Sequence, residues 1–445
     1  MLRRLSTLFL LVAATLQHGL TQQLHNPVSN YGMGDFLDND QTAVISTGWA
    51  DQTFYDRYHT NFNNAASYSH LQSTSFEVGI NAKNSILSSG NSDYRFWSGQ
   101  LSHLALAFPV FSPYNELLEK RNKKLHWGMG FALRPYTQVS YNYQFSTEDP
   151  AVGKVTNYHS GTGGTYKLYY NNGVSFKNIS LGVSAQYIFG KVLRSREISF
   201  TDYASYFGNL TSLKNEVYVK GFQFNFSGMY NYILNPTVNG KKTDYDKQKR
   251  LTIGASFQPM SKLQSSVNSI NYVYSSQLGT SVTDTLGSSS TLKSKNKYNA
   301  AYGAGLSYQH GAKWQVNINY DAQLFDQYAV TGLEANYKNS GILKIGGEWC
   351  PEPNSYSSFF KRSKYRVGFR TGTMPLDLNG EQTTVTSAVL GYGFPIFVNR
   401  QISHVNIALE GGQKTYGADF KEKYIRVQLG FNLNDDLWFL KRKFD

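Results

Sequence analysis

Charged residues lie inside stretches where apolar and polar side chains alternate: Glu77, Lys344, Glu348, Arg366, Arg370, Glu410 and Arg426. Alternate residues of a strand point to the same face, so we expect these charges on the polar faces of their strands, lining a lumen. One interpretation is a charged path that guides the head group of a ligand. The other, which we favour, is internal ion pairing that also holds the N-terminal segment, because an unpaired buried charge is costly.

A second group of carboxylates lies near the N-terminus: Asp35, Asp38, Asp40, Asp51 and Asp56. The first three loosely suggest a calcium site, but the spacing lacks the glycine and the distal glutamate of an EF-hand loop. Solvation or pairing with lumen arginines is the interpretation we favour. The sequence therefore predicts neither a metal site nor a cofactor.

Catalytic motifs are not found in the sequence, which contains neither G-x-S-x-G nor H-E-x-x-H. Ser403 and His404 cannot form a Ser–His pair, because adjacent residues of a strand point to opposite faces. The single cysteine, Cys350, excludes a disulfide framework and a cysteine-based zinc site. We interpret it as a small residue at a strand end, and we expect no enzyme.

The elements that position these residues are strands, because apolar and polar residues alternate with a period of two along most of the chain. A weak run lies at 166–170, and fifteen clearer runs lie at 76–82, 104–110, 127–133, 139–145, 179–189, 222–226, 251–257, 270–274, 302–308, 314–320, 343–349, 365–369, 390–394, 405–409 and 425–433. A barrel with both ends in the periplasm has an even number of strands. We therefore consider 14 and 16 strands.

The N-terminus carries an export signal. Arg3 and Arg4 precede the apolar stretch 8–14, and Gly19 and Thr21 are small enough for cleavage before Gln22. The apolar stretch is too short for a spanning helix, which needs about 20 residues. The mature protein is therefore expected outside the inner membrane.

The composition fits a membrane barrel. Tyr, Phe and Trp make up 15% of the residues, and aromatic rings suit membrane–water interfaces. The net charge of +13 comes from scattered lysines and arginines, so basic loops facing lipopolysaccharide explain it at least as well as nucleic acid, which the export signal argues against. The prediction is an all-β, transmembrane antiparallel β-barrel of a gram-negative outer membrane, with a soluble all-β protein as the alternative.

Three segments share glycine and proline five positions apart: Gly130 with Pro135, Gly254 with Pro259, and Gly346 with Pro351. Proline cannot donate to a strand ladder, so we expect strand ends, kinks or bulges there. Asn379-Gly380 predicts a tight hairpin turn.

The last run contains Gln428, Gly430, Phe431 and Leu433, a polar-x-Gly-apolar-x-apolar pattern of the kind that the barrel-assembly machinery reads on a terminal strand. Further stretches are Asn61-Phe-Asn-Asn-Ala-Ala-Ser-Tyr68, Leu104-Ala-Leu-Ala-Phe-Pro109, Trp127-Gly-Met-Gly130, Gly161-Thr-Gly-Gly164, Tyr365-Arg-Val-Gly368, Gly391-Tyr-Gly-Phe-Pro395, Glu410-Gly-Gly412 and Trp438-Phe-Leu-Lys-Arg-Lys-Phe444. On these, nearly the whole mature chain resembles the FadL-like outer-membrane transport family, in its Bacteroidota form.

The resemblance implies a barrel of 14 strands with an N-terminal plug. It places a ligand or plug junction at Asn61, Asn64, Ala65, Ser67 and Tyr68, where Ala65 replaces the usual proline of the family. In fatty-acid transporters of this family, a hydrophobic ligand binds in the lumen and leaves through the wall. Relatives of the same shape carry cargo in type IX secretion, so shape does not fix function.

The expected organisation is a signal peptide at 1–21, a plug at 22–72, a barrel at 73–433 and a tail at 434–445. Our first hypothesis is a passive outer-membrane transporter for hydrophobic, fatty-acid-like molecules, which predicts an apolar lumen pocket and a strand kink. The alternative is an accessory barrel that binds protein partners in a secretion or assembly complex, which predicts a lumen packed with paired charges and an exposed loop surface. Lipid, lipopolysaccharide and the barrel-assembly machinery are the other expected partners.

Overall fold

The computed structural model describes residues 26–38, 40–90, 92–111, 124–150, 153–200, 209–238, 241–243, 247–275, 282–325, 330–333, 335–398 and 401–436. The export signal predicted at 1–21 and most of the tail predicted at 434–445 lie outside these ranges. Among the described helices, none combines the length and the apolar composition needed to cross a membrane.

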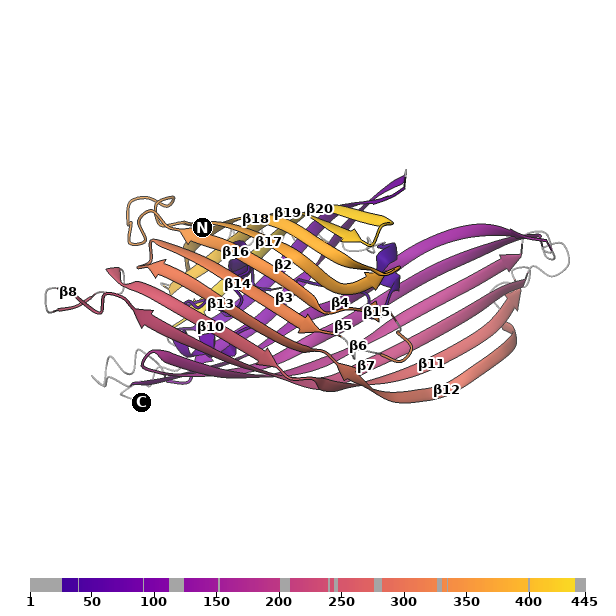
Figure 1. Cartoon of the computed structure of the whole chain (residues 1–445), viewed down its shortest axis with the longest axis horizontal. Coiled ribbons are helices and arrows are strands. Elements are labelled where there is room, and N and C mark those ends of the chain that lie inside the picture. The colour runs from indigo at the N-terminus through magenta and orange to yellow at the C-terminus, as the bar shows by residue number, and fades with distance from the viewer. Residues whose placement is uncertain are drawn as a thin grey trace.

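The described strands form a closed antiparallel barrel of 14 spans, which confirms the predicted fold class and strand number (Figure 1). It closes where β2 (Thr74–Ser89) pairs with β20 (Phe420–Asp435). The spans between them are β3 (Ser92–Pro109), β4 (Leu125–Asp149), β5 (Gly153–Phe176), β6 (Ile179–Phe200), β7 (Asn209–Ile233), β10 (Lys249–Gln258) with β11 (Ser261–Ser275), β12 (Val282–Tyr298) with β13 (Ala300–His310), β14 (Trp314–Leu324), β16 (Ser340–Trp349), β17 (Lys364–Leu378), β18 (Glu381–Val398) and β19 (Gln401–Tyr416).

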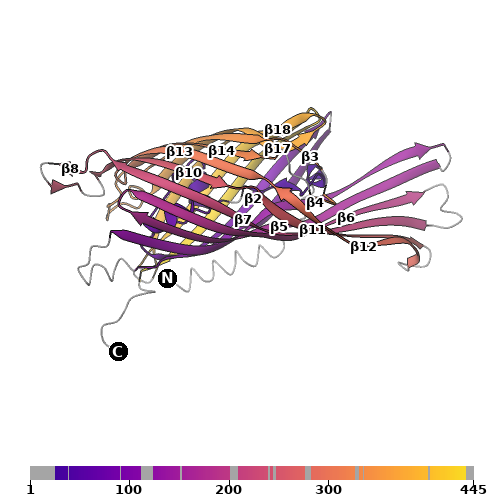
Figure 2. The ribbon, with the colours of Figure 1, turned by 60° about the horizontal axis from the view of Figure 1, so that its bottom comes forward.

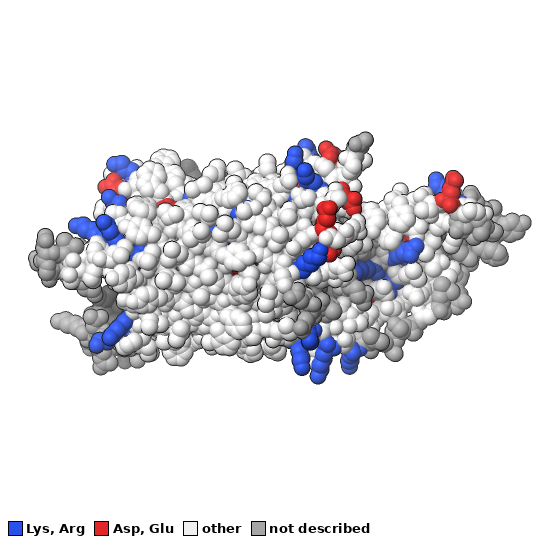
Figure 3. Space-filling model, viewed as in Figure 1, with Lys and Arg blue, Asp and Glu red and all other residues white. Residues whose placement is uncertain are grey.

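Over most of the wall, side chains alternate between an apolar outer face and a polar inner face. On β20, Ile425 and Leu433 are exposed, whereas Arg426 and Gln428 are buried. Figure 3 shows a broad uncharged band on the outside of the barrel, with most of the charged side chains gathered at its borders. The hydrocarbon region of a bilayer requires such a band, in agreement with an outer-membrane location.

Two spans consist of two strands each, and proline marks one of the breaks. Along β7, residues 209–222 pair with β11 and residues 226–233 pair with β10, and Pro259 lies between β10 and β11. Pro135 lies at a register shift between β4 and β5, and Pro351 follows the end of β16. All three glycine–proline segments therefore end or distort a strand, as proline chemistry predicts.

The wall is taller on one side of the barrel. β4, β5, β6 and β7 contain 25, 24, 22 and 25 residues, against 11 in β14 and 10 in β16. With β11 and β12 they project beyond the rest of the barrel (Figures 1 and 2). Because the barrel starts and closes at the opposite end, we assign the projecting end to the cell exterior.

An apolar cluster covers the inner face of this tall wall near the rim of the barrel. It joins inward residues of β6, β7 and β11 to residues 330–333 and to the short strand β15 (Asn336–Tyr337). Its wall members include Val192, Val217, Val219 and Leu263. A separate short hairpin, β8 (Thr237–Val238) with β9 (Lys241–Lys242), lies between β7 and β10.

The N-terminal segment, residues 26–73, packs against the inner faces of the strands. It contains η1 (Pro27–Asn30), β1 (Asp35–Phe36), α2 (Thr42–Ser46) and η2 (Ala65–His70). Trp49, Phe62 and Tyr68 are fully buried. These rings join buried apolar clusters with strand residues, such as Phe62 with Ala105, Ala132 and Tyr169.

The ladder between β3 and β4 is short. The two strands pair only between Leu104–Pro109 and Gly128–Leu133. Beyond Leu133, β4 pairs with the N-terminal segment instead, with Asp35 opposite Gln138 and Phe36 opposite Thr137. The Asn26 amide also donates to the Ser140 carbonyl over 2.9 Å. The N-terminal segment therefore covers the edge of β4 that β3 leaves unpaired.

Candidate functional site

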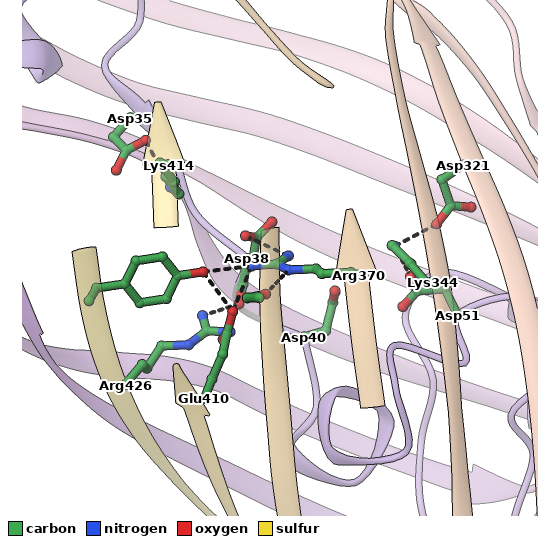
Figure 4. Close-up of polar contacts among 12 residues, drawn as sticks. Asp35, Asp38, Asp40, Asp51, Asp321, Lys344, Arg370, Glu410, Lys414 and Arg426 are labelled. Carbon is green, nitrogen blue, oxygen red and sulfur yellow. Dashed lines mark hydrogen bonds and ion pairs between the residues drawn. The ribbon is translucent and has the colours of Figure 1, made fainter. Parts of the chain in front are cut away.

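The first charged cluster surrounds Arg370, which lies on the inner face of β17 (Figure 4). Its guanidinium lies 2.9 Å from Asp38 of the N-terminal segment and 2.9 Å from Glu410 of β19. Arg426 of β20 pairs with the same Glu410 and donates to the Asp38 carbonyl. The Trp49 ring centre lies 4.4 Å from Arg370, a cation–π contact. The cluster therefore ties three strands to one turn of the N-terminal segment.

The second cluster surrounds Lys344 on β16 (Figure 4). Its ammonium pairs with Asp51 of the N-terminal segment and lies 2.5 Å from Asp321 of β14. Gln52 donates to Asp321 over 2.7 Å, and Asn63 donates to Asp51 over 2.9 Å. One cation here binds two carboxylates, and amide groups satisfy the remaining oxygens.

The third cluster joins β16, β17 and the loop before η2. Arg366 Nε donates to Glu348 over 2.7 Å. Lys364 lies 3.0 Å from Glu348 and 3.2 Å from Asp56. His59 lies 3.3 Å from Asp56. Glu348 and Asp56 thus share the lysine across the boundary between the barrel and the N-terminal segment.

Glu77 on β2 lies in a smaller polar group. It accepts a hydrogen bond from the Thr60 hydroxyl over 2.9 Å, and its other oxygen lies 3.5 Å from His103. Earlier in the N-terminal segment, Asp40 pairs with Arg134 of β4. All seven charges singled out from the sequence are therefore in contact with the N-terminal segment or with one another.

The N-terminal aspartates bind cations of the barrel wall. Burial by itself raises the pKa of Asp38, but Arg370, Lys414 and Arg426 outweigh it and hold the pKa below its ordinary value. The pKa of Asp56 is likewise held low, because Lys364 and His59 outweigh its burial. Across the described ranges, no group of three His, Cys, Asp or Glu side chains is arranged to hold a metal ion.

The asparagines of the predicted junction bind backbone groups. Asn61 donates to the carbonyls of Asp51 and Phe54 over 2.9 and 3.0 Å. Asn64 donates to the Gln52 carbonyl, and its side-chain oxygen caps the first turn of η2 by accepting from the Ala66 amide. The cap needs no proline at position 65, because the side chain of Asn64 itself accepts from an amide of the first turn, that of Ala66.

The other junction residues fix η2 against the wall. Ser67 donates to the Asn64 carbonyl over 2.7 Å. The Tyr68 hydroxyl accepts from Asn171 of β5 over 2.9 Å, and Ala65 is buried. Gly128 and Gly182 leave room for this approach, because an added Cβ would lie 1.9 Å and 2.2 Å from backbone atoms of η2.

The terminal-strand pattern divides between the two faces of β20. Gln428 is buried and donates to Asp40 O and Thr42 Oγ1. Gly430 is in contact with Thr42, which a Cβ would approach to 2.6 Å. Phe431 and Leu433 are exposed on the outer face.

The space left between the N-terminal segment and the wall is small and polar. A cavity of about 190 Å³ is lined by residues that include Asp38, Asp51, Arg134, Lys167, Lys344 and Arg370. It lies among the charged clusters, so a ligand there would meet ionised groups on several sides.

Ser403, His404 and Cys350 form no catalytic arrangement with one another. The Ser403 hydroxyl accepts from the Asn434 amide over 3.2 Å, while the His404 ring packs 4.8 Å from the His59 ring. Cys350 is buried directly after β16, with its sulfur 3.7 Å from the Lys361 carbonyl.

Several residues of the network were not singled out from the sequence: Arg134, Asp321, Lys414 and Glu422. Asp321 had a usable signal, because Gln315, Asn317 and Asn319 precede it at alternate positions of β14. Lys414 and Glu422 lie beyond the ends of the apolar runs, where alternation gives no signal.

Solved structures share this fold. A crystal structure of a Pseudomonas aeruginosa FadL homologue matches with a TM-score of 0.54 at 12% identity, covering 91% of this chain and 99% of that chain. A crystal structure of the Pseudomonas putida toluene transporter TodX gives 0.52 at 10% identity, covering 90% and 99%. Such low identities indicate the fold alone, a FadL-like barrel.

No curated protein sequence is similar enough to this chain to count as a match. A protein-family profile does match, and its description is BamG. The match covers residues 1–445. The chain therefore belongs to the BamG family.

Proposed function

We propose that this protein is a non-catalytic accessory barrel that binds protein partners in an outer-membrane assembly complex. The observation that carries the proposal is the network of ion pairs that joins the N-terminal segment to β4, β16, β17 and β19. Removing one partner from a buried pair costs about 3–5 kcal/mol. A segment held by several such pairs acts as a permanent plug rather than a gate.

The size and chemistry of the inner cavity support the same role. Pockets for small molecules usually measure about 300–1,000 Å³ and are mostly apolar. The cavity here is about 190 Å³, and its lining includes Asp51, Lys344 and Arg370. A fatty-acid chain would have to displace charged groups that are already paired. The prefix in the family name BamG, which is that of barrel-assembly machinery proteins, adds support from an independent source.

Exposed aromatic side chains at the periplasmic end support a role in binding a partner. The loop between β16 and β17, residues 350–363, exposes Tyr356 by 97% and Phe360 by 67%. Phe397 at the end of β18 is exposed by 66%, and Arg362 lies 5.8 Å from its ring centre. Exposed aromatic residues with an arginine are typical of the centres of protein interfaces.

The test is purification of the protein from its own membrane in mild detergent, followed by native mass spectrometry. We expect other barrel-assembly subunits in stoichiometric amounts. The double variant Tyr356→Ser/Phe360→Ser is expected to lose them. The matched control Tyr94→Ser/Phe145→Ser, which changes two residues exposed by 46% each, is expected to keep them. Protein that is extracted without a partner contradicts the proposal.

A second candidate function is passive transport of hydrophobic, fatty-acid-like molecules with lateral exit. The short β3–β4 ladder favours it, because on the extracellular side of Leu104 and Leu133 the edge of β4 pairs with β1 of the N-terminal segment rather than with β3. Lipid analysis of the same purified sample tests this candidate. A stoichiometric hydrophobic molecule in the sample, with no protein partner, supports transport. A sample that contains no hydrophobic molecule contradicts it.

A further inference from the structure

Lysines gather on the outer face of the tall wall, on four adjacent strands. They are Lys191 on β6, Lys214 and Lys220 on β7, Lys262 on β11, and Lys293, Lys295 and Lys297 on β12. We call this group the lysine face. The inward neighbours Val192, Val219 and Leu263 are buried in the apolar cluster, so the lysines point outward.

The lysine face lies where the apolar band ends. On β7 the outward side chains Phe226, Phe224 and Phe222 are exposed, and Lys220 is the next residue on that face. On β6 the outward series continues to Phe189 and then reaches Lys191. Because this border lies toward the projecting end, the lysines are at the level of the outer-leaflet head groups.

The register brings like charges together. Lys262 lies directly opposite Lys297, and Lys295 and Lys220 lie on either side of Gln264. Lys220, Lys262 and Lys295 thus lie at neighbouring positions of three adjacent strands, where like charges repel one another. Among the described residues, no acidic side chain forms an ion pair with Lys220, Lys262, Lys293 or Lys295, whereas Lys191 pairs with Glu216 over 2.9 Å. An anion from outside the protein would relieve this repulsion.

A hollow next to the lysines supplies apolar surface. It measures about 820 Å³ and is lined by Tyr187, Phe189, Tyr218, Lys220, Lys293 and Lys295, among others. The inner side of the same strands is already filled by the apolar cluster, so this hollow opens outward. A ligand that fits it has an anionic head group and an apolar part.

We propose that the lysine face binds a phosphorylated glycolipid of the outer leaflet. Lysine binds phosphate as a point charge, and clustered lysines at a membrane border attract anionic head groups. Phosphate groups would lie among Lys220, Lys262, Lys293 and Lys295, and the apolar part would lie against Tyr187 and Phe189. The charge and the position of this face carry the inference, which does not depend on the proposed function.

The test measures binding of bis-phosphorylated lipid A, and of the same lipid after dephosphorylation, to the full chain by native mass spectrometry. The test variant is Lys220→Gln/Lys262→Gln/Lys293→Gln/Lys295→Gln. The control removes four exposed lysines at the opposite end: Lys177→Gln/Lys247→Gln/Lys249→Gln/Lys313→Gln. We expect the wild type and the control to prefer the phosphorylated lipid by at least about tenfold, and the test variant to lose this preference.

A test variant that keeps the preference, or a control that loses as much, overturns the proposal. So does a wild type that binds both lipids equally, or an acidic protein that cross-links to the lysine face in the native membrane. If the fourfold variant does not fold, Lys262→Gln alone gives the answer. It removes a single charge at an exposed position, so it is expected to fold as well as the wild type and to bind the phosphorylated lipid more weakly.

Discussion

Arg370 binds two carboxylates that come from distant parts of the chain, Asp38 and Glu410, and it is buried. Arg370→Gln would remove this cation from both carboxylates and leave Arg426 as the remaining cation beside Glu410. We expect a loss of about 3–5 kcal/mol in the free energy of unfolding, measured by urea denaturation in detergent. Arg95→Gln, at an exposed site on β3, is the control and is expected to change the same quantity by less than about 0.5 kcal/mol. Equal effects of the two variants would contradict the role given to Arg370.

Cys350 is predicted to be unreactive in the folded protein. Burial raises the pKa of its thiol to about 11, so the reactive thiolate is scarce at neutral pH. A thiol reagent at pH 7.5 should label the native protein slowly and the denatured protein completely. Rapid labelling of the native barrel would show that the site opens.

At the residue scale, alternation in the sequence predicted the strand face on which a charged side chain lies, but it did not predict the partner of that side chain. Glu410 and Arg426 were both expected on the inner face, and they lie directly opposite each other on β19 and β20. That Asp38 completes this pair could not be predicted, because it lies 388 positions before Arg426 in a segment without periodicity. Contacts of this kind depend on the path of the whole chain through the barrel.

At the scale of elements, attachment of the N-terminal segment should depend on pH. Asp38 and Asp56 have folded-state pKa values below the ordinary 3.8, because nearby cations favour their charged forms. The stabilisation is therefore fully present above about pH 4 and is lost as pH falls through the folded-state values. Hydrogen exchange of residues 26–73, corrected for intrinsic rates, should be equally slow at pH 7 and 5 and faster near pH 2.5. Exchange in β18 and β19 is the internal control, and equally slow exchange of residues 26–73 at all three pH values would contradict the prediction.

The pairing of β1 with β4 can be tested by a disulfide. Asp35 and Gln138 lie directly opposite each other in an antiparallel pair, a geometry that two cysteines can bridge. Asp35→Cys/Gln138→Cys is expected to form a disulfide under mild oxidation, detected by a mobility shift after cleavage between the two sites. Asp35→Cys/Gln144→Cys moves the second cysteine along β4 by about 20 Å and should remain reduced.

The apolar runs predicted most of the strands, and their number exceeded the number of spans for a physical reason. The runs at 127–133 and 139–145 both lie in β4, on either side of the bulge at Pro135. The runs at 251–257 and 270–274 lie in β10 and β11, which form one span. Counting the weak run, 16 runs thus correspond to 14 spans. In both spans a short stretch with proline, Pro135 or Pro259, interrupts the apolar alternation, so one span gives two runs.

For the whole molecule, the projecting wall should be dispensable for folding. Beyond Tyr143, the β4–β5 hairpin exposes Phe145 and Tyr158 by 46% and 40%, so it contributes little buried surface. Replacing residues 145–157 by Asn-Gly should leave the temperature of the heat-induced gel shift within a few degrees of the wild type. Tyr170→Pro, in the middle of β5, removes a ladder hydrogen bond and should abolish the folded band. Loss of folding in the shortened protein would show that the wall stabilises the barrel.

The sequence alone determined that the protein is an outer-membrane barrel, because a period of two and an aromatic-rich apolar face are local properties that the bilayer selects. It also predicted which charges lie on the inner faces. Only the tertiary structure decided that Asp38, Asp51 and Asp56 meet those charges, and that the N-terminal segment replaces β3 along the edge of β4. The physical reason is that these contacts are set by barrel closure and by the packing of a segment without periodicity, and neither leaves a local pattern in the sequence.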